Sequence, residues 1–186
     1  MNNSRPLVDK IAPLLLTPDA LVTLSLEDAK TVAGYMTVTQ LEPQAIVFQA
    51  DQIEAANDYM LLVLDGEILI ETLSSGDSTV VVNVLGQGHL IGEMSLLDSA
   101  PRSATCTAQT MVEVALLTRS HLEQIMDEHP SIAARFLMAI AKRLADRVRL
   151  GNHKLLLLSQ VNEAMREEMN VKTRKRPHRF IVSAAV

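Results

Sequence analysis

Three patterns of hydrophobic and polar positions follow one another along the chain. Capping residues ahead of short apolar stretches predict small helices within residues 1–40, with helix starts at Thr17–Pro18 and Ser25–Asp28. From about Ala45 to residue 118 the pattern changes to short runs typical of strands. Beyond residue 118 the apolar spacing becomes helical. This order predicts a sheet region between two helical regions.

The sheet region contains six short apolar runs separated by turn residues. Asp65–Gly66 lies between the first two runs and predicts a tight hairpin, because such turns require positive φ angles. Strands of this length at even spacing indicate an antiparallel roll or barrel rather than a parallel α/β sheet. The predicted strands are Tyr59–Leu64, Ile68–Leu73, Thr79–Leu85, His89–Ile91, Ala104–Ala108 and Val112–Leu117.

The C-terminal region predicts two helices. Ser120 with Glu123 forms a capping box for the first helix, and Pro130 is suited to the first turn of the second. From Leu137 onward, apolar residues recur at alternating spacings of four and three, which is a coiled-coil pattern. The seam is made of Leu137, Ala141, Leu144, Val148, Gly151, Leu155, Leu158, Asn162, Met165 and Met169.

This seam predicts a homodimer through residues 137–169. Packing on the roll is the alternative for Leu137–Leu144, but beyond Leu150 no predicted strand remains to cover the seam. A second copy of the chain is therefore the expected partner. Asn162 would favour one register, because a buried polar residue selects among alignments, and Gly151 marks a bend.

Composition bounds the chain to one domain and shows an uneven charge. The 186 residues are 48% apolar, enough for one core and too little for two ordinary domains. Residues 1–171 carry 12 basic and 22 acidic side chains, a net charge of −10, whereas residues 172–179 carry five basic ones. An acidic body is a poor match for a phosphate backbone, so DNA is an unexpected partner. The tail 171–186 is expected to be flexible, and an arm for nucleic acid or an acidic protein is the alternative.

The sequence lacks the signals of several other classes of protein. Cys106 is the single cysteine, which excludes an intrachain disulfide and a cysteine-based zinc site. The chain has no signal-peptide core and no apolar run of membrane-spanning length. No motif places a nucleophile beside a base or groups metal ligands. We therefore expect a cytoplasmic protein that is not an enzyme and holds neither a metal nor a cofactor.

The stretch from Gly88 to Thr105 is the one most informative about chemistry. Gly92 lets the backbone approach a ligand, and the N–H groups of the following helical turn are suited to an anion. Arg102 carries a planar charged fork that fits two phosphate oxygens. Glu93 would repel a phosphate but accept a sugar hydroxyl. Together these groups indicate a compact nucleotide, although a structural Glu93–Arg102 ion pair is the alternative.

Two motifs here resemble the phosphate-binding cassette of the cyclic nucleotide-binding domain, the module shared by the catabolite activator protein, cyclic-nucleotide-dependent kinases and cyclic-nucleotide-gated channels. Gly92–Leu96 stands where the family usually has Gly-Glu-Leu-Ala-Leu, and Pro101–Thr105 is similar to its Pro-Arg-(Ala/Ser/Thr)-Ala ending. Upstream, Phe48–Asp51 and Tyr59–Gly66 resemble the early strands, with Ala50 in place of the usual glycine. The resemblance spans residues 20–165, roughly.

The resemblance implies roles for individual residues. Arg102 would pair with the cyclic phosphate and Glu93 would hold the ribose 2′-hydroxyl. Ser103 would place a hydroxyl beside the phosphate, which in syn-purine complexes also favours guanine. The backbone of Gly92, Met94 and Ser95 would complete the cradle, and Ala104 and Arg147 complete the predicted ligand-binding set.

The identity of the base is less determined than the phosphate site. The activator family has a Thr-Ser pair on its long helix, where this chain has Asp146–Arg149. Arg147 is the candidate to stack on a purine, and an exposed arginine is the alternative. The resemblance implies cAMP first, cGMP second, and leaves a different cyclic or bis-nucleotide open.

The predicted fold is mainly β with helices: an antiparallel β-roll, a jelly-roll-like double-stranded β-helix, with helices at both ends including a long dimerisation helix. Its parts are an N-terminal helical segment 1–40, the roll 41–118 with the cassette 88–105, the helices 119–170 and the tail 171–186.

The expected function is a stand-alone cyclic nucleotide sensor that signals through its C-terminal helix to an unknown protein partner. The activator family continues into a winged helix-turn-helix domain, but only seventeen residues follow Met169 here. The first alternative is a ligand-independent dimerisation or interaction module. The second is a DNA-associated regulator that uses the basic tail.

Overall fold

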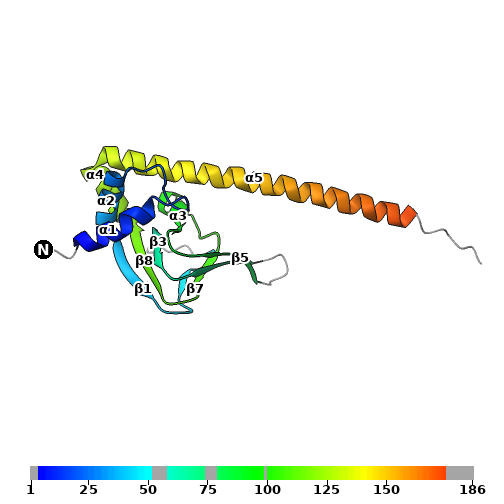
Figure 1. The fold of residues 1–186 in the computed structure, drawn as a ribbon, viewed down its shortest axis with the longest axis horizontal. Coiled ribbons are helices and arrows are strands. Elements are labelled where there is room, and N and C mark those ends of the chain that lie inside the picture. The colour runs from blue at the N-terminus through cyan, green and yellow to red at the C-terminus, as the bar shows by residue number, and fades with distance from the viewer. Residues whose placement is uncertain (1–3, 52–57, 74–78, 99, 175–186) are drawn as a thin grey trace, which may run out of the picture. The chain divides into compact units, whose positions relative to one another are not determined.

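The computed structural model describes residues 4–51, 58–73, 79–98 and 100–174. The chain divides into two compact units, Met1–Arg143 and Leu144–Val186. The first unit contains all the described strands, with helices at both ends of the strand region (Figure 1). The helices are α1 (Ser4–Leu15), α2 (Leu26–Gly34), α3 (Glu93–Asp98), α4 (Arg119–Glu128) and α5 (Pro130–Arg174), the last of which begins in the first unit and continues as the second.

The strands form two four-stranded antiparallel sheets, which confirms the predicted roll. The first sheet has the order β1-β8-β3-β6 and the second the order β2-β7-β4-β5. All described pairings are antiparallel, as the short even spacing of the runs indicated. The strands are β1 (Thr37–Leu41), β2 (Ile46–Phe48), β3 (Tyr59–Asp65), β4 (Ile68–Leu73), β5 (Thr79–Leu85), β6 (Leu90–Ile91), β7 (Thr105–Ala108) and β8 (Val112–Thr118).

The predicted hairpin at Asp65–Gly66 is wrong. β3 pairs with β8 and β6, whereas β4 pairs with β5 and β7, so the chain passes from one sheet to the other at this turn. Gly66 has a φ of +86°, and a Cβ there would lie 2.4 Å from the carbonyl oxygen of Met111. The turn residues were therefore read correctly, but the strand partners are set by packing between distant segments.

The core lies between the two sheets. In β3 every residue from Met60 to Leu64 is buried, without the alternation of a half-exposed strand. This is expected of a strand inside its sheet that is covered on both faces, here including contacts from α1 and α3. The cluster of buried residues combines Phe48, Leu61, Val63, Ile68, Ile91, Cys106, Ala108, Val112 and Val114. The core thus fixes the strand ends that carry the site.

Two of the helix starts predicted from sequence are confirmed. Ser25 caps α2, because its hydroxyl oxygen accepts a hydrogen bond of 3.1 Å from the backbone N–H of Asp28. Pro130 is the first residue of α5 and directly follows the end of α4.

Two other predicted helix starts are wrong. After α1 the chain makes turns instead of a helix at Pro18, and the Thr17 hydroxyl donates to the Gly88 carbonyl at 2.7 Å. For α4 the capping residue is Thr118, whose hydroxyl oxygen accepts from the N–H of His121, rather than Ser120. Thr118 has the extended backbone of a strand end, which is the conformation that an N-cap requires.

The predicted segment boundaries need small corrections. β1 begins at Thr37, inside the segment 1–40 that was predicted as helical. At the other end α5 continues to Arg174, so its last turn includes Lys172 of the basic tail. Residues 175–186 of the tail lie outside the described residues.

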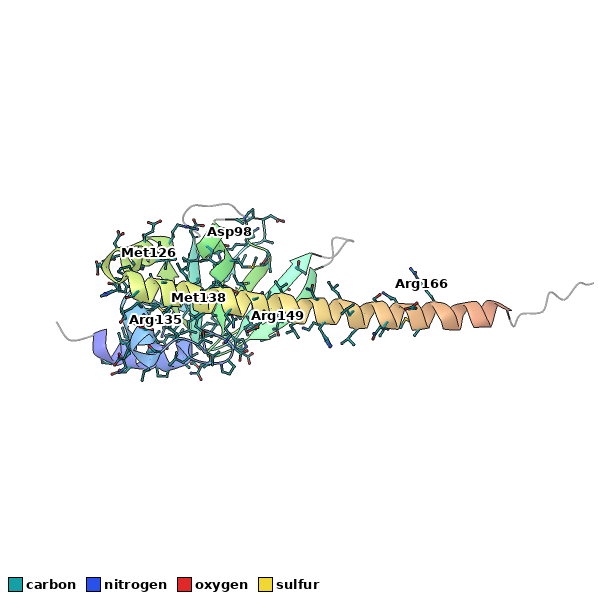
Figure 2. The ribbon with its side chains drawn as sticks, turned by 90° about the horizontal axis from the view of Figure 1, so that it is seen from above. Asp98, Met126, Arg135, Met138, Arg149 and Arg166 are labelled. Carbon is teal, nitrogen blue, oxygen red and sulfur yellow. The ribbon has the colours of Figure 1, made fainter. Side chains whose placement is uncertain are left out.

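Polar contacts fasten α2 to the C-terminal helices of the first unit. The guanidinium of Arg135, labelled in Figure 2, donates two hydrogen bonds of 2.7 Å to the carboxylate of Asp28. The hydroxyl of Tyr35 donates to Glu128 at 2.6 Å. These bonds join α2 to α5 and α4, and Figure 1 shows α1, α2 and α4 gathered together.

The beginning of α5 packs on the rest of the first unit through a face different from the predicted seam. Ala133, Phe136, Ala139 and Ile140 are buried, whereas Ala141 of the seam is exposed. Met138, labelled in Figure 2, is 70% exposed.

The second unit consists, within the described residues, of the continuation of α5. Its exposed large apolar side chains include four seam residues and four others. The seam residues are Val148, Leu155, Leu158 and Met165, and the others are Leu150, Leu156, Leu157 and Val161. Over the part of the chain that the structure describes, no helix is long and apolar enough to cross a membrane.

Candidate functional site

Arg102 lies at the centre of the candidate site, in the loop that leads into β7. Its side chain is only 5% exposed. Nη1 donates to the Gly92 carbonyl at 3.2 Å and Nη2 donates to the Tyr59 carbonyl at 2.9 Å. The two motifs of the predicted cassette are therefore in contact through Gly92 and Arg102. A charged side chain this well buried, held at the turn before a short helix, is suited to an anionic ligand.

Gly92 has two structural reasons to be glycine. Its φ is +83°, a conformation that other residues adopt only with strain. A Cβ built at this position would lie 2.7 Å from Arg102 Nη1 and 2.8 Å from Cζ of Phe48. The backbone of the turn thus packs directly against the arginine, as the cassette motif implied.

Glu93, the first residue of α3, is 1% exposed and faces a residue that sequence analysis did not select. Its Oε1 lies 4.0 Å from Nε of Arg143 on α5. Arg143 also donates to the carbonyl oxygens of Leu90 at 3.1 Å and of Ala20 at 3.4 Å. A carboxylate buried beside an arginine is a strong acceptor for a hydroxyl group.

A further arginine, Arg119, contacts α3 at its third residue, Ser95. Arg119 Nη2 donates to the carbonyl of Ser95 at 3.2 Å, and Nε of the same side chain bonds Asp58 at 3.2 Å. Ser95 is 5% exposed, whereas Met94 is 45% exposed. The short helix is therefore anchored to the start of α4 and to the segment before β3, which fixes the N–H groups of its first turn.

The other predicted site residues are less enclosed. Ser103 is exposed and Ala104 is half-buried beside Arg102. Arg147 is exposed and belongs to the second unit, so its predicted contact with a base stays a prediction.

The comparison with protein families decides which domain this geometry represents. Residues 38–129, from β1 to the end of α4, match the family model described as "Cyclic nucleotide-binding domain". The chain contains a cyclic nucleotide-binding domain. The cassette with Gly92, Glu93 and Arg102 lies inside the matched residues.

Individual relatives support this assignment. The transcriptional regulator Cmr of Mycobacterium tuberculosis, of the helix-turn-helix type, is 32% identical over 119 residues, which are 64% of this chain and 47% of that protein. The chain thus matches about half the length of this curated relative. A solved cyclic nucleotide-binding domain from Methylobacillus flagellatus has 25% identity and a TM-score of 0.65, covering 76% of this chain and 78% of that one. The catabolite activator protein of Thermus thermophilus has 27% identity and a TM-score of 0.63, over 79% and 63%.

Burial shifts the pKa values of groups around Arg102. Desolvation lowers the pKa of Arg102 from its usual range, opposed by electrostatic interaction with the ionised forms of Tyr59, Asp58, Cys106 and Glu93. Desolvation also raises the pKa of Tyr59, against the effect of the nearby arginine. It raises the pKa of the Cys106 thiol to about 11, so this thiol is a buried apolar group of the domain at neutral pH.

The residues that directly contact Glu93 or Arg102 through their side chains, Arg143, Phe48 and Tyr59, were missed by sequence reasoning. Arg143 shares one helix face with Phe136 and Ile140, and an arginine on the buried face of an amphipathic helix was the available signal. Phe48 and Tyr59 lie at the ends of strands, and nothing in their local sequence indicated contact with Arg102. Within the described residues no group of three or more His, Cys, Asp or Glu side chains is arranged to hold a metal ion.

Proposed function

We propose that the protein is a cyclic nucleotide sensor, with cAMP as the preferred ligand and cGMP as the second. One observation carries this proposal: Arg102 and Glu93, at 5% and 1% exposure, are both buried within the cassette. A permanent cation and a carboxylate acceptor so close along the chain suit one phosphate and one ribose hydroxyl. The similarity to a solved cyclic nucleotide-binding domain and to a catabolite activator protein supports the ligand class.

The phosphate would be bound by Arg102 and by N–H groups of the turn at Gly92, Met94 and Ser95. The ribose 2′-hydroxyl would donate to Glu93, and Ser103 would lie on the phosphate side. This division of roles needs no catalytic step, and we propose that the protein acts by binding alone. A cytoplasmic location fits a chain whose single cysteine is buried.

The signal would pass to α5 through Arg143. This residue bonds the Leu90 carbonyl in the cassette and lies beside Glu93. The carboxylate of Glu93 would therefore contact both a bound ribose and α5. A ligand shifts α5 only to the extent that it prefers one of two placements of that helix. We propose that a homodimer formed through residues 137–169 transmits the shift to a protein partner.

The test is a calorimetric titration of the full chain with cAMP and cGMP, beside Arg102→Ala. Loss of the arginine is expected to lower affinity by ~2–5 kcal/mol, since it removes one partner of a buried charge pair. Arg166→Ala, which replaces an exposed arginine outside the seam and outside Asp146–Arg149, is the matched control and is expected to bind as the wild type does. Failure of both nucleotides to bind at high micromolar concentration would contradict the sensor proposal.

The second candidate function is a ligand-independent dimerisation module. The observation in its favour is that the charged groups of the cassette have protein partners: Arg102 bonds two backbone carbonyls, and Glu93 lies beside Arg143. Under this alternative the same titration gives no heat for any cyclic nucleotide, while the chain still forms dimers.

A further inference from the structure

An aromatic surface lies directly under the guanidinium of Arg102. Its Cζ atom is 3.8 Å from the centroid of the Phe48 ring and 5.2 Å from the centroid of the Tyr59 ring. The two rings are themselves 5.1 Å apart and inclined by 37°. At 3.8 Å the guanidinium is in van der Waals contact with the face of Phe48, the geometry of a cation–π pair.

The two rings are fixed by the core of the roll. Phe48 is 4% exposed at the end of β2, opposite Cys106 of β7 in the second sheet. The Tyr59 hydroxyl donates to the carbonyl of Val47 at 3.0 Å, which ties the start of β3 to the same strand. Neither ring depends on a ligand for its position.

The guanidinium of Arg102 is restricted by contacts on both its edge and its face. Nη1 and Nη2 are held by the carbonyl oxygens of Gly92 and Tyr59, while Phe48 supports the plane of the group. The ring face also offers electrostatic compensation to a charge whose pKa is lowered by burial. A lysine at this position could not use the flat contact, because only arginine has a planar charged group.

We propose that Phe48 is a positioning residue for the anion site: it fixes the plane of the Arg102 guanidinium before a ligand arrives, with Tyr59 as the second wall. This inference rests on the proposed function for its ligand, the phosphate of a cyclic nucleotide. A guanidinium held in advance loses little conformational freedom on binding, so the aromatic support contributes to affinity without touching the nucleotide.

The first test is a double-mutant cycle with calorimetric titration of cAMP. Phe48→Leu keeps an apolar side chain of similar size and removes the ring, and it is expected to weaken binding about fivefold to thirtyfold. In an Arg102→Lys background the same change is expected to alter affinity less than twofold, roughly, since the flat contact is already lost. Phe136→Leu, which replaces a fully buried phenylalanine on α5, is the matched control. It is expected to leave the affinity for cAMP unchanged.

The second test needs no ligand. In the free protein, the Nε–H proton of Arg102 should resonate upfield because the Cζ of its guanidinium lies over the Phe48 ring, and Phe48→Leu should abolish this shift. Tyr59→Phe keeps the second ring and should retain most of it. Equal loss of affinity from Phe48→Leu in the Arg102 and Arg102→Lys backgrounds, or an Nε–H shift that does not respond to Phe48→Leu, would overturn the proposal.

The two tests separate this inference from the proposed function. If the wild type bound no cyclic nucleotide, the sensor proposal would fail and with it the phosphate role of Phe48. The resonance of Arg102 would then still decide whether the Phe48 ring fixes the position of the guanidinium.

Discussion

Oε1 of Glu93 and Nε of Arg143 lie 4.0 Å apart, joining the first residue of α3 to α5. Glu93 is 1% exposed, and the side chain of Arg143 is 16% exposed, so water screens the pair only weakly. Arg143 bonds the Leu90 carbonyl as well, which makes it the contact through which the cassette and the beginning of α5 hold one another.

Replacing Arg143 should therefore loosen α5 and destabilise the first unit. We expect Arg143→Ala to lower the free energy of unfolding by about 1–3 kcal/mol, because it leaves a buried carboxylate without this partner. Chemical denaturation measures the effect. Lys142→Ala, at the exposed neighbouring position, should stay within about 0.5 kcal/mol of the wild type. Equal effects of the two substitutions would show that the contact with Glu93 has no energetic weight.

Glu93 should act on one functional group of the ligand. Glu93→Gln is expected to weaken cAMP binding by about 1.5–3 kcal/mol, the value of a hydrogen bond to a charged group. The same variant should bind 2′-deoxy-cAMP almost as the wild type does, because the hydroxyl in question is absent. Calorimetry with both nucleotides checks this, with Glu123→Gln on the exposed face of α4 as the control. Equal losses for the two ligands would argue against a ribose contact.

Gly92 should tolerate no side chain. Its φ of +83° and the close approach of Arg102 and Phe48 predict that Gly92→Ala costs about 1–3 kcal/mol of stability and weakens nucleotide binding. Gly151→Ala is the matched substitution in α5, where a Cβ meets nothing within 4 Å. It should stabilise the helix by up to ~1 kcal/mol. Thermal unfolding of the two variants should therefore shift in opposite directions.

The bond between Asp28 and Arg135 predicts a dependence of stability on pH. The hydrogen bonds from Arg135 hold the pKa of the Asp28 carboxyl below its ordinary value of 3.8. A lowered pKa means that the folded state favours the charged form of Asp28. The stabilisation is therefore present above the ordinary pKa of 3.8 and is lost as the pH falls through the folded pKa.

Asp28→Asn should accordingly lower the unfolding temperature more at about pH 6 than at about pH 3. The control is Asp9→Asn, which removes an exposed ion pair with Lys30 and should show no such difference. Thermal scans across this range measure both. A gap between the wild type and Asp28→Asn that stays constant down to the lowest pH would contradict the assignment.

The seam on the second unit predicts a dimer, and substitution of two seam residues should convert it to a monomer. Leu155 and Leu158 occupy seam positions and are 66% and 60% exposed in the single chain. Leu155→Glu combined with Leu158→Glu should give a monomer in sedimentation at tens of micromolar, where the wild type should be a dimer. Leu156→Glu changes an equally exposed leucine that lies off the seam and should leave the dimer intact. A monomeric wild type would contradict the homodimer.

Local chemistry explains which parts of the fold could be predicted. The strands from Tyr59 to Thr118 appear close to their predicted limits, because β-branched runs and turn residues act over a few positions. The pairing at Asp65–Gly66 was misjudged for the opposite reason. Two strands joined by a turn pair with each other only if no distant strand pairs with either of them instead. Here β8 pairs with β3 and β7 pairs with β4.

The residues of the candidate site likewise fall into two groups, those that a local motif identified and those that only the fold brings to the site. Gly92, Glu93 and Arg102 were identified from a motif in which spacing and residue type alone carry the chemistry, and the fold brings Gly92 and Arg102 into contact. Arg143, Phe48 and Tyr59 come from three other elements. Their relation to the cassette arises only when the two sheets pack together and the beginning of α5 packs on the roll.

The sequence by itself determined the order of elements, the roll and the cassette with its arginine, since these follow from periodicity, turn chemistry and a short motif. Only the tertiary structure decided that Arg102 rests on Phe48 and that Glu93 faces Arg143 rather than solvent. The physical reason is that a buried charge takes its partners from whatever the packed core brings within a few ångströms, and those neighbours lie far away along the chain.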